Sequence, residues 1–321
     1  MKSIGPIGLV LLSMVFTQPV APPMPPGSST IGNFVATSPC DAVSRAALKI
    51  PATANCEMIK WHLTLFEDAD AKTLTPTTFE LNCVYGLPEQ WTTGLSKGGT
   101  NLGWKGRWKI VPGADAIVYE LDLGVPNGTV SFLKVDHNLL HLLDRNKSLA
   151  IGNAGWSYTL NRTGDLRRNI KQAAGTSQPQ LASPITYASQ ITTDSSMLGR
   201  FVGRSPCQDV ASELSKVVTP DCIKVKWDLT LYQDPNTLAP TSYKLRGTFF
   251  REHVREGKWT IVRGTKTSPT AVVYQLDPDK PQGSLFLLKA DGNILFFLDR
   301  DRNFLVGNSN FSYTLNREAA R

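Results

Sequence analysis

An internal repeat constrains this chain more than any other feature of its sequence. The segment "FVATSPCDAVSRAALKI", which starts at Phe34, corresponds to "FVGRSPCQDVASELSKV", which starts at Phe201. The correspondence continues through "CEMIKWHLTLFED" and "CIKVKWDLTLYQD". It is strongest between residues 138–162 and 293–317, which agree at 13 of 25 positions without a gap. Residues 34–162 and 199–317 are therefore predicted to be two copies of one domain, each large enough for its own core.

Three segments lie outside the two copies. Residues 1–21 begin with Lys2, an apolar run and then small residues, which predicts a secretory signal peptide. Residues 22–33 form a Pro-rich spacer, and residues 163–198, rich in Ser, Thr, Gln and Ala, are predicted to be a flexible linker. No cysteine precedes Cys40 to carry a lipid. We therefore expect a periplasmic or secreted protein with no membrane span and no lipid anchor.

Within each copy the apolar residues alternate with polar ones. Trp61, Leu63 and Leu65 share one face of "WHLTLF", and "FSYTLNR" alternates in the same way. About seven or eight such strands per copy, separated by Gly-, Asn- and Asp-rich turns, are typical of an antiparallel barrel or sandwich. A barrel is favoured because it leaves no open edge. The predicted fold is all-β, with two tandem small antiparallel β-barrels, each with one short N-terminal helix.

The stretch "GRSPCQDVASEL" (203–214) carries the signal for that helix. Ser205 suits the N-cap, Pro206 the first helical position, and Gln208 completes a capping box. A thiol in the first turn of a helix faces unpaired amides, which favour the thiolate. Cys207 is therefore a candidate nucleophile, metal ligand or half of a disulfide.

The other cysteines favour the disulfide. Four of the five form matching pairs at nearly equal spacing, Cys40 with Cys56 and Cys207 with Cys222. In an exported chain this pattern predicts one disulfide per copy, with a metal pair or a reactive thiol as alternatives. Closing a loop of about 15 residues would stabilise each copy by roughly 3 kcal/mol. Cys83 has no counterpart and is expected to be a buried free thiol.

The remaining polar candidates do not form a convincing active site. His137 and His141 have a spacing that suits a metal on a helix, but they lie in a predicted turn and strand. No histidine recurs in both copies. Recurring acids close Leu-Asp strand ends and are expected to cap turns rather than form a glycosidase pair, namely Asp122, Asp144, Asp277 and Asp299. We therefore expect no catalysis.

Aromatic side chains recur at matching places in the two copies. They could line a ligand cavity in each barrel, although core filling is the favoured interpretation because all lie in strands of period two. The residues are Trp61, Trp108, Tyr119, Tyr158, Trp227, Trp259, Tyr274 and Tyr313, together with the matching pair Trp156 and Phe311. The loop 86–103 has no equal in the second copy, and its Trp91 is a candidate exposed contact.

The formal net charge of +7 is unevenly spread. Residues 1–162 carry 13 basic against 12 acidic side chains, whereas residues 199–321 carry 18 against 13, a balance of +5. The basic residues are scattered and not grouped with aromatics, which favours a solvated surface over a nucleic-acid site.

The order "FVGRSPC", a short helix, strands that end in Leu-Asp and a Gly-Asn turn resembles the N-terminal domain of NlpE-like copper-resistance proteins. The resemblance implies a lipocalin-like barrel in the bacterial envelope, with roles in copper tolerance or envelope stress. The family's Cys-x-x-Cys is incomplete here, because Val43 and Val210 stand in place of the second cysteine. Only Cys40 and Cys207 carry over as candidate copper ligands.

The expected function is therefore a non-catalytic binding or sensing module of the envelope. Its partner would be an envelope protein or a small ligand, with copper implied by the resemblance alone. The alternative is a lipocalin-like carrier of a small apolar ligand, held inside the barrels.

Overall fold

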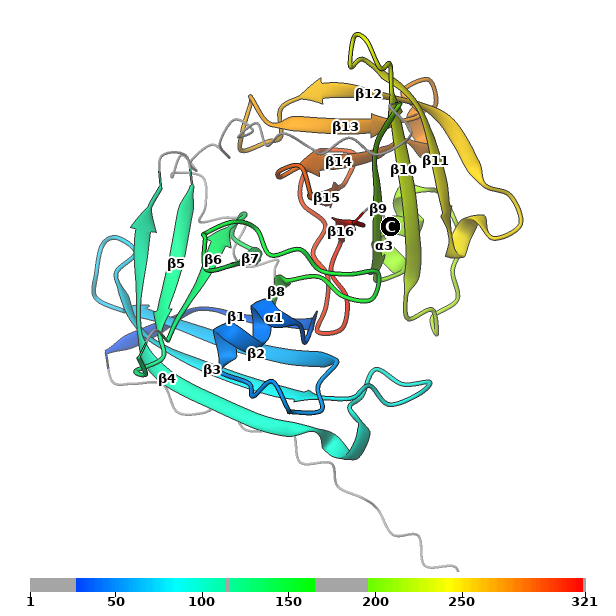
Figure 1. The fold of residues 1–321 in the computed structure, drawn as a ribbon. Coiled ribbons are helices and arrows are strands. Elements are labelled where there is room, and N and C mark those ends of the chain that lie inside the picture. Colours follow the sequence, from blue (N-terminus) through cyan, green and yellow to red (C-terminus); the bar gives the residue numbers. More distant parts are fainter. Residues whose placement is uncertain (1–26, 114–115, 127, 165–195, 320–321) are drawn as a thin grey trace, which may run out of the picture.

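The computed structural model describes residues 27–113, 116–126, 128–164 and 196–319. Within them the chain forms two closed, eight-stranded antiparallel barrels in tandem, as predicted (Figure 1). The predicted signal peptide and nearly all of the predicted linker lie outside the described residues.

Barrel 1 is a meander in which each strand pairs with the next and β8 closes on β1. Its strands are β1 (Ser28–Pro39), β2 (Met58–Asp68), β3 (Pro76–Gly86), β4 (Thr100–Pro112), β5 (Ile117–Asp122), β6 (Thr129–Lys134), β7 (Leu139–Leu143) and β8 (Thr159–Thr163). A helix α1 (Ala42–Leu48) follows β1, and a 3-10 turn η1 (Ser96–Gly98) precedes β4.

Barrel 2 repeats this order and closes where β16 pairs with β9. Its strands are β9 (Met197–Ser205), β10 (Val225–Gln233), β11 (Pro240–Gly247), β12 (Arg255–Arg263), β13 (Val272–Leu276), β14 (Leu285–Lys289), β15 (Ile294–Leu298) and β16 (Thr314–Arg317). The other elements are the helix α3 (Gln208–Glu213) and the 3-10 turns η2 (Thr248–Phe250) and η3 (Pro281–Gly283).

The boundaries differ from the predicted ones at two places. The strand β1 already begins at Ser28, inside the predicted spacer 22–33, because residues 28–30 pair with the far end of β2. The second helix begins at Gln208 rather than at Pro206. Ser205 is not its N-cap but the last residue of β9, where its hydroxyl accepts a hydrogen bond from the Trp227 indole at 2.8 Å. The predicted N-cap was wrong because the Ser205 hydroxyl is bonded to a core tryptophan and not to the amides of the helix.

Two loops cross between the barrels and hold them together (Figure 1). The β7–β8 loop reaches barrel 2, and the β15–β16 loop reaches barrel 1. Gly152 N donates to Asn316 Oδ1 at 2.8 Å, and Gly307 N donates to Asn161 Oδ1 at the same distance. A Cβ on either glycine would stand within 2.3 Å of a carbonyl oxygen of its own loop, that of Trp156 or Phe311, so the folded form of each loop requires glycine there.

The contacts across the interface are reciprocal. Asn161 donates to the carbonyl of Asn308, and Asn316 donates to the carbonyl of Asn153. Two like pairs meet on the axis itself, Ser157 with Ser312 at 2.5 Å and Thr159 with Thr314 at 2.8 Å. Each serine and threonine is thus bonded to its own counterpart in the repeat. Each asparagine makes the same bonds to the other barrel as its counterpart does. The two barrels are related by a pseudo-two-fold axis, as in an isologous dimer.

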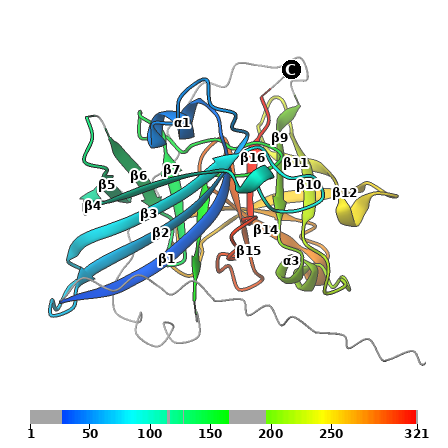
Figure 2. The same ribbon diagram turned by 90° about the horizontal axis from the view of Figure 1, so that it is seen from below.

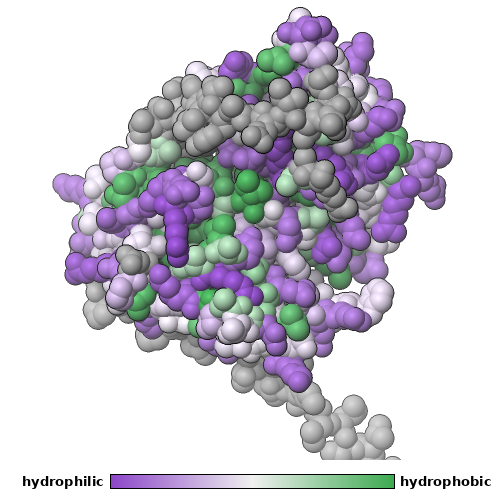
Figure 3. Space-filling model, viewed as in Figure 1, coloured by the Kyte–Doolittle hydropathy of each residue, from purple (hydrophilic) through white to green (hydrophobic). Residues whose placement is uncertain are grey.

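Apolar side chains flank this polar seam. Leu133, Leu139 and Leu143 of barrel 1 pack with Leu288, Ile294 and Leu298, which are their counterparts in barrel 2. In Figure 3 apolar side chains gather over β5 to β7, on the side that faces barrel 2. Figure 2 shows the helices α1 and α3 on opposite sides of the molecule, as the pseudo-two-fold relation requires. The interface therefore buries a third apolar cluster besides the two barrel cores.

Candidate functional site: a cleft between the barrels

A cleft of about 290 Å³ lies where the two barrels meet. Its lining comes from three places that are far apart in the sequence. Barrel 1 supplies Thr37, Met58 and Trp156, barrel 2 supplies Arg204, Lys224, Asn310 and Phe311, and the β3–β4 loop supplies Pro88, Glu89, Trp91, Thr92, Thr93 and Gly94. The cleft therefore exists only when the barrels are assembled on each other.

The cleft straddles the pseudo-two-fold axis. Thr37 is the repeat counterpart of Arg204, Met58 of Lys224, and Trp156 of Phe311. Both members of each pair face the same space. Chemically, however, the pairs are unlike, because barrel 1 contributes a hydroxyl and a thioether where barrel 2 contributes two cations.

Arg204 is the more buried of these two cations. It projects from β9, and its Nη1 lies 3.9 Å from the position that a Cβ would take on Gly155 in the β7–β8 loop. Its Nε is buried and has no hydrogen-bond partner. Burial lowers the pKa of the guanidinium. A buried donor without a partner is energetically unfavourable.

Lys224 lies beside it, with its Nζ 5.8 Å from the centre of the Phe311 ring. Burial is the main cause that lowers the pKa of Lys224, and the like charges of Arg204 and Lys226 lower it further. Within the described residues, no acidic side chain forms an ion pair with Arg204 or Lys224. This side of the cleft therefore carries uncompensated positive charge.

Lys60 adds a third cation at the edge. Its Nζ donates to Asn310 Oδ1 at 3.1 Å, and burial lowers the pKa of this lysine. The one acid in the lining is Glu89, whose carboxylate accepts a hydrogen bond from Thr92 within its own loop. The balance of charge at the cleft is positive.

The β3–β4 loop forms the wall that has no counterpart in barrel 2. A bridge between Pro88 and Leu95 closes its base, and Glu89 N donates to Gly94 O at 3.1 Å. At its tip Trp91 has a positive φ of 65° and is 99% exposed. The predicted exposure of Trp91 is confirmed, and its role as a contact stays a prediction.

The predicted disulfides are formed, and none of their four cysteines lines the cleft, although Cys56 Sγ lies 3.8 Å from the carbonyl oxygen of the cleft residue Met58. Cys40 is bonded to Cys56 and Cys207 to Cys222, with Cα–Cα distances of 5.7 and 6.0 Å. Neither Cys40 nor Cys207 therefore offers a free thiolate to copper in this state. Cys83 is a buried free cysteine, and burial raises the pKa of its thiol well above the ordinary value.

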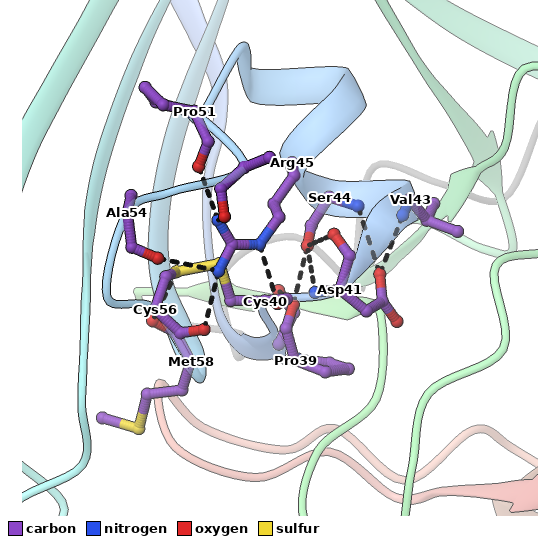
Figure 4. The surroundings of a disulfide bond; sticks show 12 residues. Pro39, Cys40, Asp41, Val43, Ser44, Arg45, Pro51, Ala54, Cys56 and Met58 are labelled. Carbon is purple, nitrogen blue, oxygen red and sulfur yellow. Dashed lines mark hydrogen bonds between the residues drawn. A yellow bond between two sulfur atoms is a disulfide. The ribbon is translucent and has the colours of Figure 1, made fainter.

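Arg45 encloses the first disulfide loop (Figure 4). Its guanidinium donates to the carbonyls of Cys40, Pro51, Ala54 and Cys56 at 2.6 to 3.3 Å. The counterpart of Arg45 in barrel 2 is Ser212, which cannot make these bonds. The two loops are thus cross-linked alike but supported differently.

Eight of the recurring aromatic residues fill the barrel cores and do not line the cleft, whereas the recurring pair Trp156 and Phe311 does line it. Six of these eight have a polar atom that is hydrogen-bonded inside the protein, namely Trp61, Trp108, Tyr158, Trp227, Trp259 and Tyr313. The Trp61 indole donates to Ser38 at 2.8 Å, as Trp227 does to Ser205, and the Trp108 indole donates to the Phe66 carbonyl at 2.7 Å. These bonds favour the core-filling interpretation over a ligand-lining one.

The predicted turn acids divide into two groups. Asp122 caps the amide of Gly124, and Asp144 and Asp299 accept amide bonds from their own turns. Asp277 differs from the prediction, because its carboxylate is buried and bonded to Tyr243 and Arg255 instead.

The two histidines of the His-x-x-x-His pattern do not face one site. His141 is fully buried at the interface, with its ring bonded to Thr159 Oγ1 and to the Ala150 carbonyl, each at 2.9 Å. Burial lowers the pKa of His141 to about 4. Across the described part of the chain, no group of three or more His, Cys, Asp or Glu side chains is arranged to hold a metal.

Fold and disulfides together define a tandem β-barrel protein of an oxidising, non-cytoplasmic compartment. None of the helices in the described ranges combines the length and apolar content of a membrane span. Comparison of the chain with family models, curated proteins and solved structures finds no match.

Sequence reasoning missed the cleft and its cations. Arg204 and Lys224 were counted among scattered basic residues, because the sequence does not show which residues meet across an interface between domains. One signal was available: the best-matched segment of the repeat, 138–162 with 293–317, supplies both loops that cross at the axis.

Proposed function

We propose that this protein is an exported, non-catalytic binding module whose ligand site is the cleft between its barrels. One observation carries the proposal. The cleft is assembled from both halves of the chain at the pseudo-two-fold axis, and it combines an unpaired buried arginine donor, a lysine and three aromatic side chains. Small-molecule sites typically place a few convergent polar groups beside aromatic side chains in a concavity, and this cleft has both.

The size of the cleft limits the ligand. A volume of about 290 Å³ lies at the lower end of the range of about 300–1,000 Å³ that is usual for ligand pockets. The ligand is therefore small, and the residues that bind it approach from rigid strands and from hydrogen-bonded loops. A role in the periplasm or outside the cell, in envelope sensing or in copper tolerance, belongs to the same proposal. The disulfides support the location outside the cytoplasm, and only the sequence resemblance supports envelope sensing or copper tolerance.

The carrier function inside the barrels is a weaker candidate, because the aromatic residues that would line such a cavity are packed and bonded in the cores. The non-catalytic assignment is supported by the recurring acids, which serve turns or an ion pair.

The test is a screen of small fragments of positive, neutral and negative charge by ligand-observed NMR on the full chain. The decisive variant is Thr93→Trp, which fills the cleft from the loop, with Asn310→Trp as a second filling variant. We expect a set of fragments to lose binding in both. The matched control is Asn236→Trp in the exposed β10–β11 turn, which should change nothing. If no fragment distinguishes the filled variants from the control, the cleft is not the site.

A further inference from the structure

The two walls of the cleft differ in chemistry, and the difference specifies the ligand. This inference rests on the proposed function and deepens it. Arg204 and Lys224 come from barrel 2, whereas Trp156 comes from the β7–β8 loop of barrel 1, next to Gly155 beside the Arg204 guanidinium, and Trp91 comes from the β3–β4 loop. A ligand that contacts both the cations and the indoles must present an acceptor group and a ring.

The charged wall is suited to an anion. Arg204 offers a buried Nε–H without a partner, and the Lys224 ammonium is held near it by the Phe311 ring. Two cations brought together in a partly buried site repel each other, and an anion between them removes that repulsion. Charge-assisted hydrogen bonds from arginine and lysine to a carboxylate or phosphate are stronger than neutral ones. The single acid of the lining, Glu89, is bonded to Thr92 within the loop and does not neutralise them.

The other wall is suited to a ring. Trp156 is partly buried in the β7–β8 loop, whereas Trp91 is 99% exposed at the tip of a loop that barrel 2 lacks. An indole offers a wide flat face for stacking against a planar or saccharide ring, and such contacts add to simple burial. The β3–β4 loop therefore completes the site on the side where the repeat alone would leave it open.

We propose that the inter-barrel cleft binds a small anion joined to a single ring, with Arg204 and Lys224 on the anionic group and Trp91 and Trp156 against the ring. Two sources of such a ligand share this chemistry, an aromatic acid and an acidic sugar. The volume of about 290 Å³ leaves room for one ring with one acidic group rather than for an oligomer.

The experiment measures dissociation constants by calorimetry on the full chain with four probes. Phenyl phosphate and glucose 6-phosphate represent the two sources, benzylammonium carries a ring with the opposite charge, and inorganic phosphate carries the anion without a ring. We expect one of the two ring phosphates to bind at least about tenfold more tightly than inorganic phosphate, and benzylammonium not to bind.

The substitutions follow the repeat itself. Arg204→Thr and Lys224→Met install the residues that barrel 1 carries at the same places, so the fold accepts them on one side already. Each should weaken binding of the ring phosphate by about tenfold or more. Trp91→Ala should also weaken binding of the ring phosphate but leave binding of inorganic phosphate unchanged. Arg246→Thr, on the exposed outer face of β11, is the matched control. Raising the salt concentration should weaken binding of the ring phosphate to the wild type, and it should weaken binding to Arg204→Thr by a smaller factor.

The outcomes separate this inference from the proposed function. If benzylammonium binds as tightly as the ring phosphates, or if Arg246→Thr weakens binding as much as Arg204→Thr, the ligand class is wrong. If neutral or cationic fragments nevertheless lose binding in the cleft-filling variant Thr93→Trp, the cleft remains the binding site and only the ligand class is wrong. If no fragment loses binding in Thr93→Trp, both proposals fail.

Discussion

The two barrels have the same fold, one disulfide each and matching core tryptophans, yet their charged side chains differ in position and burial. Barrel 1 exposes Asp122 as a turn cap and buries the neutral His141 at the interface. Barrel 2 buries Asp277 with Arg255 and places Phe296 at the position of His141. Duplication has therefore preserved the scaffold and the interface, whereas the polar groups that touch them have diverged. Each difference can be tested by an exchange between the copies.

The largest effect is expected at the buried ion pair of barrel 2. Asp277, 5% exposed, accepts from Arg255 Nη2 at 2.7 Å and from Tyr243 OH at 2.6 Å. Arg255→Met would leave a buried carboxylate without its cation, and such losses reduce the free energy of unfolding by about 3–5 kcal/mol. Urea unfolding measures this change.

Barrel 1 supplies the control for this prediction. Its Asp122 is exposed and bonded to one backbone amide, so Asp122→Asn should change the free energy of unfolding by less than about 1 kcal/mol. Adding Asp277→Asn to Arg255→Met should recover part of the loss, because the uncompensated charge is then gone. Equal effects of Arg255→Met and Asp122→Asn would contradict the contrast between the barrels.

The second effect concerns the disulfides. Replacing Cys207 and Cys222 with alanine should reduce the free energy of unfolding by about 3 kcal/mol, the value for a loop of this length. The same change at Cys40 and Cys56 should reduce it less, by about 1 kcal/mol, because Arg45 still bonds the loop carbonyls.

Arg45→Ala sharpens that comparison. With the first disulfide intact it should have a small effect, and in the Cys40→Ala, Cys56→Ala background a larger one, since the arginine then holds the loop alone. The double-mutant cycle on urea unfolding reports the coupling. A zero coupling, with equal losses from both disulfides, would show that Arg45 does not support the loop.

The third effect is a dependence on pH that only barrel 1 should show. Burial lowers the pKa of His141 to about 4, whereas the unfolded chain takes up this proton near pH 6.5. Between those values the unfolded state binds the proton and the folded state does not, so stability falls as the pH falls. The loss attributable to His141 should reach about 3 kcal/mol at pH 4.

His141→Phe installs the residue of barrel 2 and tests this assignment. The variant should be less stable at pH 7, because Thr159 Oγ1 and the Ala150 carbonyl lose a partner. Its stability should nevertheless fall less steeply than that of the wild type between pH 6.5 and 4. Parallel pH profiles for the two proteins would refute a role for His141 in the acid response.

The success of sequence reasoning followed the range of the contacts. Period two in "WHLTLF" and the matched spacing of Cys207 and Cys222 are local signals, and both the barrels and the disulfides were predicted from them. The start of α3 was misplaced, because Ser205 has the right identity for an N-cap but is held by Trp227 from another strand. The cleft was beyond reach for the same reason. Arg204 meets Trp156 only through the docking of two domains, and no local pattern encodes that docking.

The smallest effect is expected on the surface of barrel 1, where Glu120 accepts from Lys109 and Lys147. The hydrogen bond from Lys147 is the main cause that lowers the pKa of Glu120. The stabilisation is therefore present above the ordinary pKa of glutamate and is lost as the pH falls through the lower, folded-state value. Glu120→Gln, which copies Gln275 of barrel 2, should reduce the free energy of unfolding by no more than about 1 kcal/mol, since both lysines are exposed to solvent. This loss should shrink in high salt, whereas the loss in Arg255→Met, from a buried pair, should not. If salt affects both variants alike, the distinction between a solvated charge cluster in one barrel and a buried pair in the other does not hold.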